Sequence, residues 1–233
     1  MAKTENLDRL QEILGVNFTN PNLLEEALTH SSYVNENPSA VANERLEFVG
    51  DAVLGLILAE KLFQDYPELE EGALTRMRSR LVRRTSLAAI ARSINLGDFL
   101  SLGRGEATSQ GRIKTANLAG ALEAVFAAVY LDQDWESTRG CVMRIFREEL
   151  ERIRHEHYGD DYKSLLQELE QLRYHATPRY RIVSEMGPDH ARQFTAEVMV
   201  EETVLAHGTG RSKKLAEADA ARVALEQLGE NLD

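Results

Sequence analysis

Two patterns of apolar residues divide the chain. From residue 6 to residue 150, apolar side chains recur every three or four positions, with short Gly-, Pro- or Asn-containing breaks, which predicts successive helices packed on a core. After one further helical stretch, three alternating runs predict β-strands at residues 180–185, 193–200 and 203–207. An Ala-rich helical segment follows at 212–228. The sequence therefore predicts an all-α domain over residues 1–154, a linker over 155–161 and an α+β domain of order α-β-β-β-α over 162–230.

One predicted helix, beginning after Asn43, carries three carboxylates on one side. At about 100° per residue, Glu44, Glu47 and Asp51 fall within about 60° of arc. The opposite side is the apolar stripe of a packed helix, formed by Leu46, Val49, Val53 and Ile57. Like charges this close raise one another's pKa unless a cation neutralises them, and Mg²⁺ prefers such oxygen ligands. The pattern favours a divalent metal site, and a solvated acidic face is the alternative.

Phe48 lies beside these carboxylates, roughly 140° around the helix from the centre of the apolar stripe. A large aromatic side chain next to a charged face is typical of an interface. We therefore predict that Phe48 lies where two copies of the chain meet across a two-fold axis, which would join their acidic faces in one groove. The alternative is a second, smaller core within the same chain that covers Phe48.

Residues 43–54 resemble the signature of bacterial ribonuclease III, a family of double-strand-specific endoribonucleases. Further blocks resemble the family in the same order, at residues 71–78, 102–106 and 124–132. The resemblance covers nearly the whole chain, and the order α-β-β-β-α of the second domain is that of a double-stranded RNA-binding domain. The resemblance implies an all-α endonuclease domain followed by a double-stranded RNA-binding domain.

The metal ligands that the resemblance implies come from two helices. Glu123 lies in a nearly unbroken apolar helix, where an unpaired charge costs on the order of several kcal/mol, so it needs a cation or a tight partner such as an arginine. Its similarity to the family's metal-bridging glutamate favours the cation. Where the family has an aspartate one turn earlier, this chain has Gly120. We therefore expect Glu47, Asp51 and Glu123 to bind Mg²⁺, or Mn²⁺, with water in place of the missing ligand.

The resemblance implies hydrolysis of double-stranded RNA to 5′-phosphate and 3′-hydroxyl ends, by attack of a metal-activated water on phosphorus. Two sites in one dimer would leave short 3′ overhangs, as in the processing of ribosomal and messenger RNA precursors. Asp51 and Glu123 are the expected catalytic carboxylates, and Glu44 and Glu71 match family positions with supporting roles in the cleft. Because Gly120 removes a ligand, the alternative is a catalytically weakened dimer that binds double-stranded RNA without cutting it.

The second domain carries a basic cluster at the start of its last helix, formed by Arg211, Ser212, Lys213 and Lys214. Helix N-terminal amides and two lysines together form a phosphate site, although a Lys-Lys pair taken alone is usually just solvated. In the family, the first helix and the first inter-strand loop enter successive minor grooves, where 2′-hydroxyls distinguish RNA from DNA. The matching residues here are Gln167, Glu168, Pro188 and His190.

The net charge of −11 is unusual for a protein that binds nucleic acid, so binding must rest on local basic patches. One such patch consists of four arginines in a single predicted helical region, Arg76, Arg80, Arg83 and Arg84. These side chains either line the approach to the groove or form ion pairs with nearby surface acids. A third interpretation, an acidic protein-interaction scaffold, predicts no RNA affinity and leaves Lys213 and Lys214 unexplained.

Composition also limits the location and partners that we expect. The single cysteine, Cys141, excludes an internal disulfide framework, and no apolar run approaches the length of a transmembrane helix. The N-terminus lacks the pattern of a secretion signal. We therefore expect a cytoplasmic homodimer that binds double-stranded RNA, with no membrane partner and no small-molecule cofactor.

Overall fold

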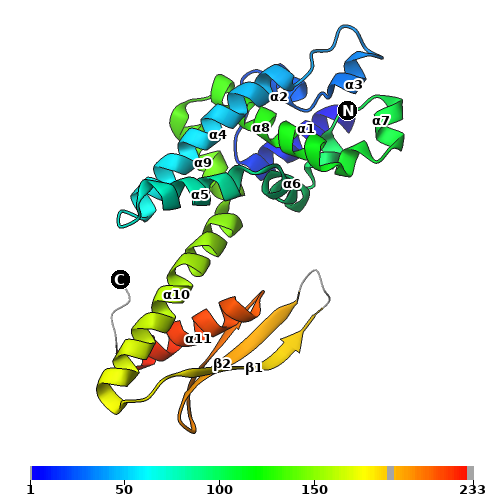
Figure 1. Cartoon of the computed structure of the whole chain (residues 1–233). Helices are drawn as coiled ribbons and strands as arrows, with labels where there is room; N and C mark the ends of the chain where they lie inside the picture. Colours follow the sequence, from blue (N-terminus) through cyan, green and yellow to red (C-terminus); the bar gives the residue numbers. More distant parts are fainter. Residues whose placement is uncertain (1, 188–191, 230–233) are drawn as a thin grey trace. The chain divides into compact units, whose positions relative to one another are not determined.

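The chain folds into two units, each with its own core, in a computed structural model that describes residues 2–187 and 192–229 (Figure 1). The boundary between the two units, each of which makes most of its contacts within itself, lies between Arg147 and Glu148. Helix α10 spans Arg147–Tyr174 and includes residues 155–161, where the sequence predicted a linker. The charged composition of residues 155–161 favoured a linker. This segment contains no proline, however, and Gly159 is its only strongly helix-disfavouring residue, so a helix can continue through it.

The first unit is helical, as the sequence predicted. Its elements are α1 (Ala2–Leu14), α2 (Pro21–Ala27), α3 (Ser31–Val34), α4 (Glu44–Asp65), α5 (Glu71–Val82), α6 (Arg84–Ser93), η1 (Leu96–Phe99), α7 (Arg104–Thr108), η2 (Gly111–Ile113), α8 (Thr115–Asp132) and α9 (Trp135–Ile145). The glycine-rich stretch from Gly103 to Gly111, expected as a break, contains the short helix α7.

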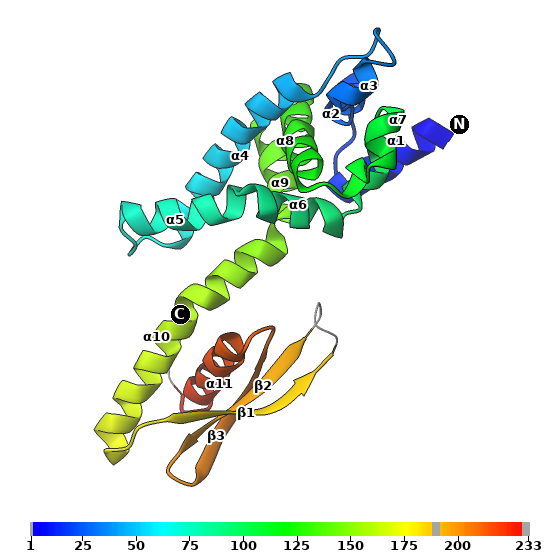
Figure 2. The same cartoon turned by 45° about the vertical axis from the view of Figure 1, so that its right-hand side comes forward.

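Helix α8 is the centre of the first unit, because it is apolar on nearly every side and is buried along most of its length. It packs most extensively against α4, and the two helices lie side by side in both views (Figures 1 and 2). Gly50 of α4 makes this approach possible. A Cβ atom built on Gly50 would lie only 1.9 Å from the carbonyl oxygen of Glu123 on α8. The backbone next to Asp51 therefore lies directly against the backbone of Glu123.

The second unit is a three-stranded antiparallel sheet of order β1-β2-β3, covered by helix α11 (Lys213–Gln227) (Figure 2). The strands are β1 (Arg179–Met186), β2 (Gln193–Val200) and β3 (Thr203–Gly210). Its core joins apolar side chains of β2 and β3 to the alanines of α11 and to the C-terminal part of α10, as at Val198, Ala206, Ala220, Ala224 and Leu166. The predicted order α-β-β-β-α is confirmed.

Strand β3 extends three residues beyond its predicted end at His207, and the reason is its packing against α11. Gly208 pairs with Ala196 of β2, and a Cβ atom built on Gly208 would lie 2.0 Å from the backbone nitrogen of Ala220. Gly208, just past the predicted end of the strand, is therefore a residue that admits the helix. None of the described helices is long and apolar enough to cross a membrane.

Candidate active site

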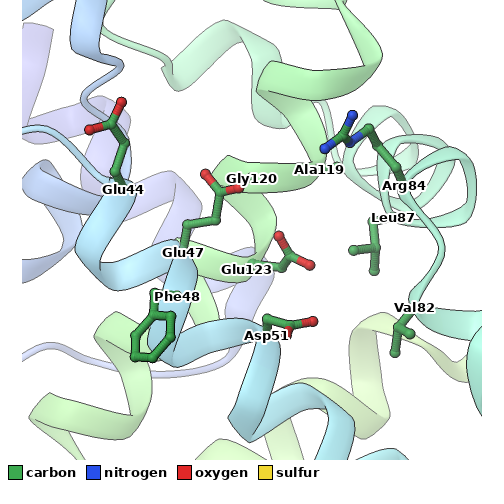
Figure 3. Close-up of a pocket in the computed structure, with 10 residues that line it drawn as sticks. All are labelled: Glu44, Glu47, Phe48, Asp51, Val82, Arg84, Leu87, Ala119, Gly120 and Glu123. Carbon is green, nitrogen blue, oxygen red and sulfur yellow. The ribbon is translucent and has the colours of Figure 1, made fainter.

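An open pocket of about 610 Å³ lies where α4, the junction of α5 and α6, and α8 meet (Figure 3). The residues that line it are Glu44, Glu47, Phe48, Asp51, Val82, Arg84, Leu87, Ala119, Gly120 and Glu123. Four of these are carboxylates, three from α4 and one from α8. The structure thus places the acidic face of the signature helix and the buried-helix glutamate, which are far apart in sequence, around one space.

Glu47 and Gly120 are in direct contact across this pocket. A Cβ atom built on Gly120 would lie 2.5 Å from one carboxylate oxygen of Glu47 and 3.2 Å from the other. Figure 3 shows the Glu47 carboxylate turned toward Gly120, with Asp51 and Glu123 next to each other lower in the pocket. Glu47 therefore fills the space that a side chain at position 120 would enter.

Glu123 is the carboxylate whose acidity the pocket changes most. Partial burial raises its pKa to about 7, and the negative charges of Glu47 and Asp51 contribute to this rise, whereas the positive charge of Arg84 opposes them less strongly. The sequence analysis left open the alternative that an arginine neutralises the charge of Glu123. Arg84 lines the same pocket but makes no ion pair with Glu123 within the described residues, so the carboxylates retain uncompensated repulsion.

These carboxylates fit a hydrated divalent cation better than an enclosed one. No three described His, Cys, Asp or Glu side chains come together closely enough to surround a metal ion. Mg²⁺, however, keeps several waters and takes only one or two protein carboxylates, so an open pocket of oxygen donors suits it. The raised pKa of Glu123 is a second sign of fit, since a cation would relieve the repulsion that contributes to it.

Two other polar residues lie elsewhere. Glu71, expected in the cleft, does not line the acidic pocket; it borders a mainly apolar pocket between α4 and α5 and accepts a 2.8 Å hydrogen bond from the Thr75 hydroxyl. Asn117, one turn before Gly120, donates its amide to Glu106 at 2.8 Å and to the Gly111 carbonyl at 3.0 Å. Asn117 therefore anchors the loop before α8 and does not replace the missing aspartate.

Comparison with known protein families agrees with this arrangement. The family profile described as Ribonuclease-III-like matches residues 20–150, which include every residue of the acidic pocket. The profile described as Double-stranded RNA binding motif matches residues 162–228. The chain belongs to the ribonuclease III family.

Curated members of the ribonuclease III family match this chain over nearly its full length. Ribonuclease 3 of Dehalococcoides mccartyi (strain CBDB1) is 55% identical over 225 residues, which are 96% of this chain and 95% of that protein. Ribonuclease 3 of Myxococcus xanthus is 46% identical over 233 residues, 99% of this chain and 90% of that protein. The chain is therefore an endoribonuclease with a double-stranded RNA-binding domain.

Solved ribonuclease III structures match the first unit. The nuclease domain of the Campylobacter jejuni enzyme is 38% identical and has a TM-score of 0.58, covering 62% of this chain and 95% of that domain. A second structure of that nuclease domain, with the same identity and TM-score and 61% of this chain covered, is described as showing structural flexibility in a region involved in dimer formation.

The residues expected to bind RNA in this ribonuclease III lie at the surface where they are described. Gln167 and Glu168 are exposed on α10, and Arg211 and Lys213 are exposed at the start of α11. Ser212 is the N-cap of α11, and its hydroxyl accepts a 3.2 Å hydrogen bond from the Leu215 amide. Lys214 is exposed next to it. Pro188 and His190 lie outside the described residues.

Two further observations go beyond the sequence analysis. Phe48 is 81% exposed, so the alternative of a second core within the same chain is wrong. The sequence treated four arginines of the α5–α6 region alike, but among the described residues only Arg84 of these lines the acidic pocket. Helical spacing could not distinguish Arg84 from the other three arginines. It assumes one continuous helix, whereas α5 ends at Val82 and the chain turns at Arg83 before α6 begins.

Proposed function

We propose that this enzyme hydrolyses double-stranded RNA with the help of a hydrated Mg²⁺ or Mn²⁺ ion, which Glu47, Asp51 and Glu123 bind partly through its waters. The observation that carries this proposal is the meeting of Glu123 on α8 with the acidic face of α4 in one open pocket. The raised pKa of Glu123 supports it, because this arrangement of charges suits a bound cation. Hard oxygen donors and room for water favour Mg²⁺ or Mn²⁺ over softer metals.

The pocket residues have different proposed roles in phosphodiester hydrolysis. A bound divalent ion supplies an activated water and stabilises negative charge on the phosphate. Asp51 and Glu123 are next to each other in the pocket and orient these groups (Figure 3). Glu47 occupies the space over Gly120, and Glu44 lies near the rim in a supporting role. The proposed products carry a 5′-phosphate and a 3′-hydroxyl.

The second unit would hold the duplex by its shape. The proposed contacts are Gln167 and Glu168 with a minor groove and Lys213 and Lys214 with phosphates across the major groove. Arg211 and the amides at the start of α11 extend this phosphate site. Pro188 and His190 complete the set as predictions from the family pattern.

The proposed active form is a homodimer. Large apolar side chains are exposed along one face of α4 at spacings of eight and seven residues, namely Phe48 at 81%, Leu56 at 59% and Phe63 at 71%. Such a face needs a partner, and the dimer-forming region described for the C. jejuni nuclease domain supports a second copy. Two copies would place two acidic pockets in one complex, one for each RNA strand, and would leave short 3′ overhangs.

Introducing a charge into this face should separate the copies. We expect Phe48→Asp to be monomeric at micromolar concentration, because a carboxylate would be buried against its symmetry mate. Sedimentation equilibrium would report twice the chain mass for the parent enzyme and one chain mass for the variant. A parent enzyme that sediments as a monomer at all concentrations tested would refute the homodimer.

Metal dependence is tested by incubating a perfect RNA duplex with the enzyme in Mg²⁺ and in EDTA. We expect cleavage in Mg²⁺ only, with ligatable 5′-phosphates on the products. Gly120→Asp should lower the Mg²⁺ concentration needed for half-maximal rate by about 10-fold, as expected for a restored supporting ligand. The flexible end of Glu47 must move to admit the new side chain.

Binding without cleavage would instead favour the weakened RNA-binding dimer, which the family assignment does not favour. Full-rate cleavage in EDTA would end the metal proposal. As a control, Gly140→Asp adds the same charge on exposed surface where a Cβ atom meets nothing within 4 Å, and should leave the Mg²⁺ requirement unchanged.

We also propose that the substrates are precursors of ribosomal and messenger RNA in the cytoplasm. The family assignment and the single buried cysteine, Cys141, are compatible with this. Sequencing RNA 5′ ends in cells that lack the enzyme tests the proposal. Unchanged precursor ends in those cells would contradict it.

A further inference from the structure

One basic side chain lines the acidic pocket. Among the described residues of the lining, Arg84 faces four carboxylates, those of Glu44, Glu47, Asp51 and Glu123. Arg84 is exposed, and within the described part of the chain its guanidinium makes no hydrogen bond or ion pair. A cation beside several carboxylates that pairs with none of them retains its hydrogen-bond donors for another ligand.

The position of Arg84 is fixed by the residues around it. It is the first residue of α6, and Arg83 before it has an extended backbone that ends α5. The Arg83 side chain donates a 3.1 Å hydrogen bond to the Ser86 hydroxyl, which in turn donates a 2.8 Å bond to the Arg80 carbonyl. This local network holds the junction, so that Arg84 begins α6 at the edge of the pocket.

The opposite wall leaves room in front of Arg84. The α8 residue nearest to it in Figure 3 is Ala119, whose side chain is a single methyl group, whereas the Glu47 carboxylate covers the neighbouring Gly120. In this view Glu47 and Arg84 lie on opposite sides of Glu123. The pocket therefore has a carboxylate-rich side, suited to a metal ion, and a side with a guanidinium and little steric bulk, suited to an anion.

We propose that Arg84 contacts a non-bridging oxygen of the phosphate that is cleaved. The inference rests on the proposed function in placing the scissile phosphate in this pocket. In the reaction, the oxygen of water forms a bond to phosphorus, the bond from phosphorus to the 3′ oxygen breaks, the water loses a proton and the 3′ oxygen gains one. Negative charge on the non-bridging oxygens grows during this exchange, and a guanidinium placed there stabilises it.

The charges of the pocket explain why such a contact is needed. Four carboxylates and a phosphate repel one another, and a divalent cation on the carboxylate side offsets only part of this. Arginine remains charged at any working pH and presents a planar fork of donors that matches phosphate geometry. Arg84 would thus supply fixed positive charge in a site that lacks the carboxylate expected at position 120.

The test compares Arg84→Gln and Arg84→Lys with the parent enzyme in single-turnover cleavage of saturating RNA duplex, with duplex affinity measured separately in EDTA. We expect Arg84→Gln to lower the cleavage rate by about 100-fold, as for the loss of one donor to a developing oxyanion. Arg84→Lys should recover part of this rate, because it keeps the charge without the fork. Affinity should change by less than about 3-fold, since the second unit provides most contacts.

Arg9→Gln is the matched control, because Arg9 is exposed on α1 and does not line the pocket, and it should cleave at the parent rate. Thermal melting checks that each variant is folded. An Arg84→Gln variant that is folded and cleaves within about 3-fold of the parent rate would overturn the inference, as would an equal loss in Arg9→Gln. Parent cleavage that persists in EDTA would refute the metal proposal but leave the Arg84 comparison decisive, whereas a parent that cleaves under no condition would refute both.

Discussion

Glu123→Gln is expected to lower the single-turnover rate of duplex cleavage by about 100- to 1,000-fold while the enzyme still binds RNA. The amide has nearly the same shape as the carboxylate but carries no negative charge for a cation beside Asp51. Cleavage is measured at saturating duplex in Mg²⁺, and binding is measured in EDTA. A change of less than about 10-fold in rate would show that Glu123 is not part of the hydrolytic site.

The same substitution should stabilise the enzyme when no metal is bound. The folded chain holds a proton on Glu123 up to a pKa of about 7, whereas the unfolded chain releases it near the ordinary value of 4.5. The folded state therefore binds more protons between these values, and the free energy of unfolding falls as pH rises through this window. Glutamine does not titrate. In EDTA the variant should melt at a higher temperature than the parent at pH 8 and at a similar temperature at pH 4.5.

Added Mg²⁺ should reverse the order of the two melting temperatures, because ligand binding stabilises the folded parent and the Glu123→Gln variant lacks one ligand.

The double variant Lys213→Ala, Lys214→Ala is the matched comparison for the catalytic effect of Glu123→Gln. It should bind duplex more weakly and with a shallower salt dependence, yet cleave bound duplex at nearly the parent rate. An unchanged salt dependence would contradict the phosphate contacts proposed for the two lysines.

Gly50→Ala is expected to destabilise the enzyme by about 3 kcal/mol and to lower cleavage strongly in the molecules that remain folded. Helix propensity alone would predict the reverse, since alanine stabilises a helix interior by about 1 kcal/mol over glycine. The new methyl group, however, would lie 1.9 Å from the Glu123 carbonyl oxygen, so α4 and α8 must separate. Separation would move Asp51 away from Glu123. Urea unfolding and single-turnover cleavage measure the two effects.

A helical glycine with open space provides the control for Gly50→Ala. Gly140 lies within α9, where a Cβ atom would meet nothing within 4 Å. Gly140→Ala should therefore stabilise the enzyme by up to about 1 kcal/mol and leave cleavage unchanged. Equal stability of the Gly50 and Gly140 variants would show that the close contact of α4 with α8 is not needed.

The acidic pocket was predictable as far as its residues lie on one helix. Glu44, Glu47 and Asp51 share a face because about 3.6 residues complete each turn, and this geometry needs no knowledge of the rest of the fold. Pairing them with Glu123 required the family resemblance. Helical spacing alone indicated only that a charge in so apolar a helix needed a partner. It did not indicate that burial and two neighbouring carboxylates would raise the pKa of Glu123 to about 7.

Contacts between segments were harder to predict. The Asn117 amide donates hydrogen bonds to Glu106 and to the Gly111 carbonyl in the loop before α8, and its position one turn before Gly120 gave no sign of these partners. Glu71 borders another pocket within the single chain, and its place in the cleft of a dimer stays a prediction. Both residues lie on helices with the expected period, but their partners depend on how a connecting loop turns.

The sequence by itself determined that the first unit is helical, that the second has the order α-β-β-β-α and that the carboxylates of α4 share one face, because these follow from spacing along a few turns. Only the tertiary structure decided that Glu47 fills the space over Gly120 and that Arg84 enters the acidic pocket. The physical reason is that both contacts depend on distances between helices. Gly50 sets the distance between α4 and α8, because it leaves room for the backbone of Glu123. The periodicity of residues along one helix contains no information on this distance.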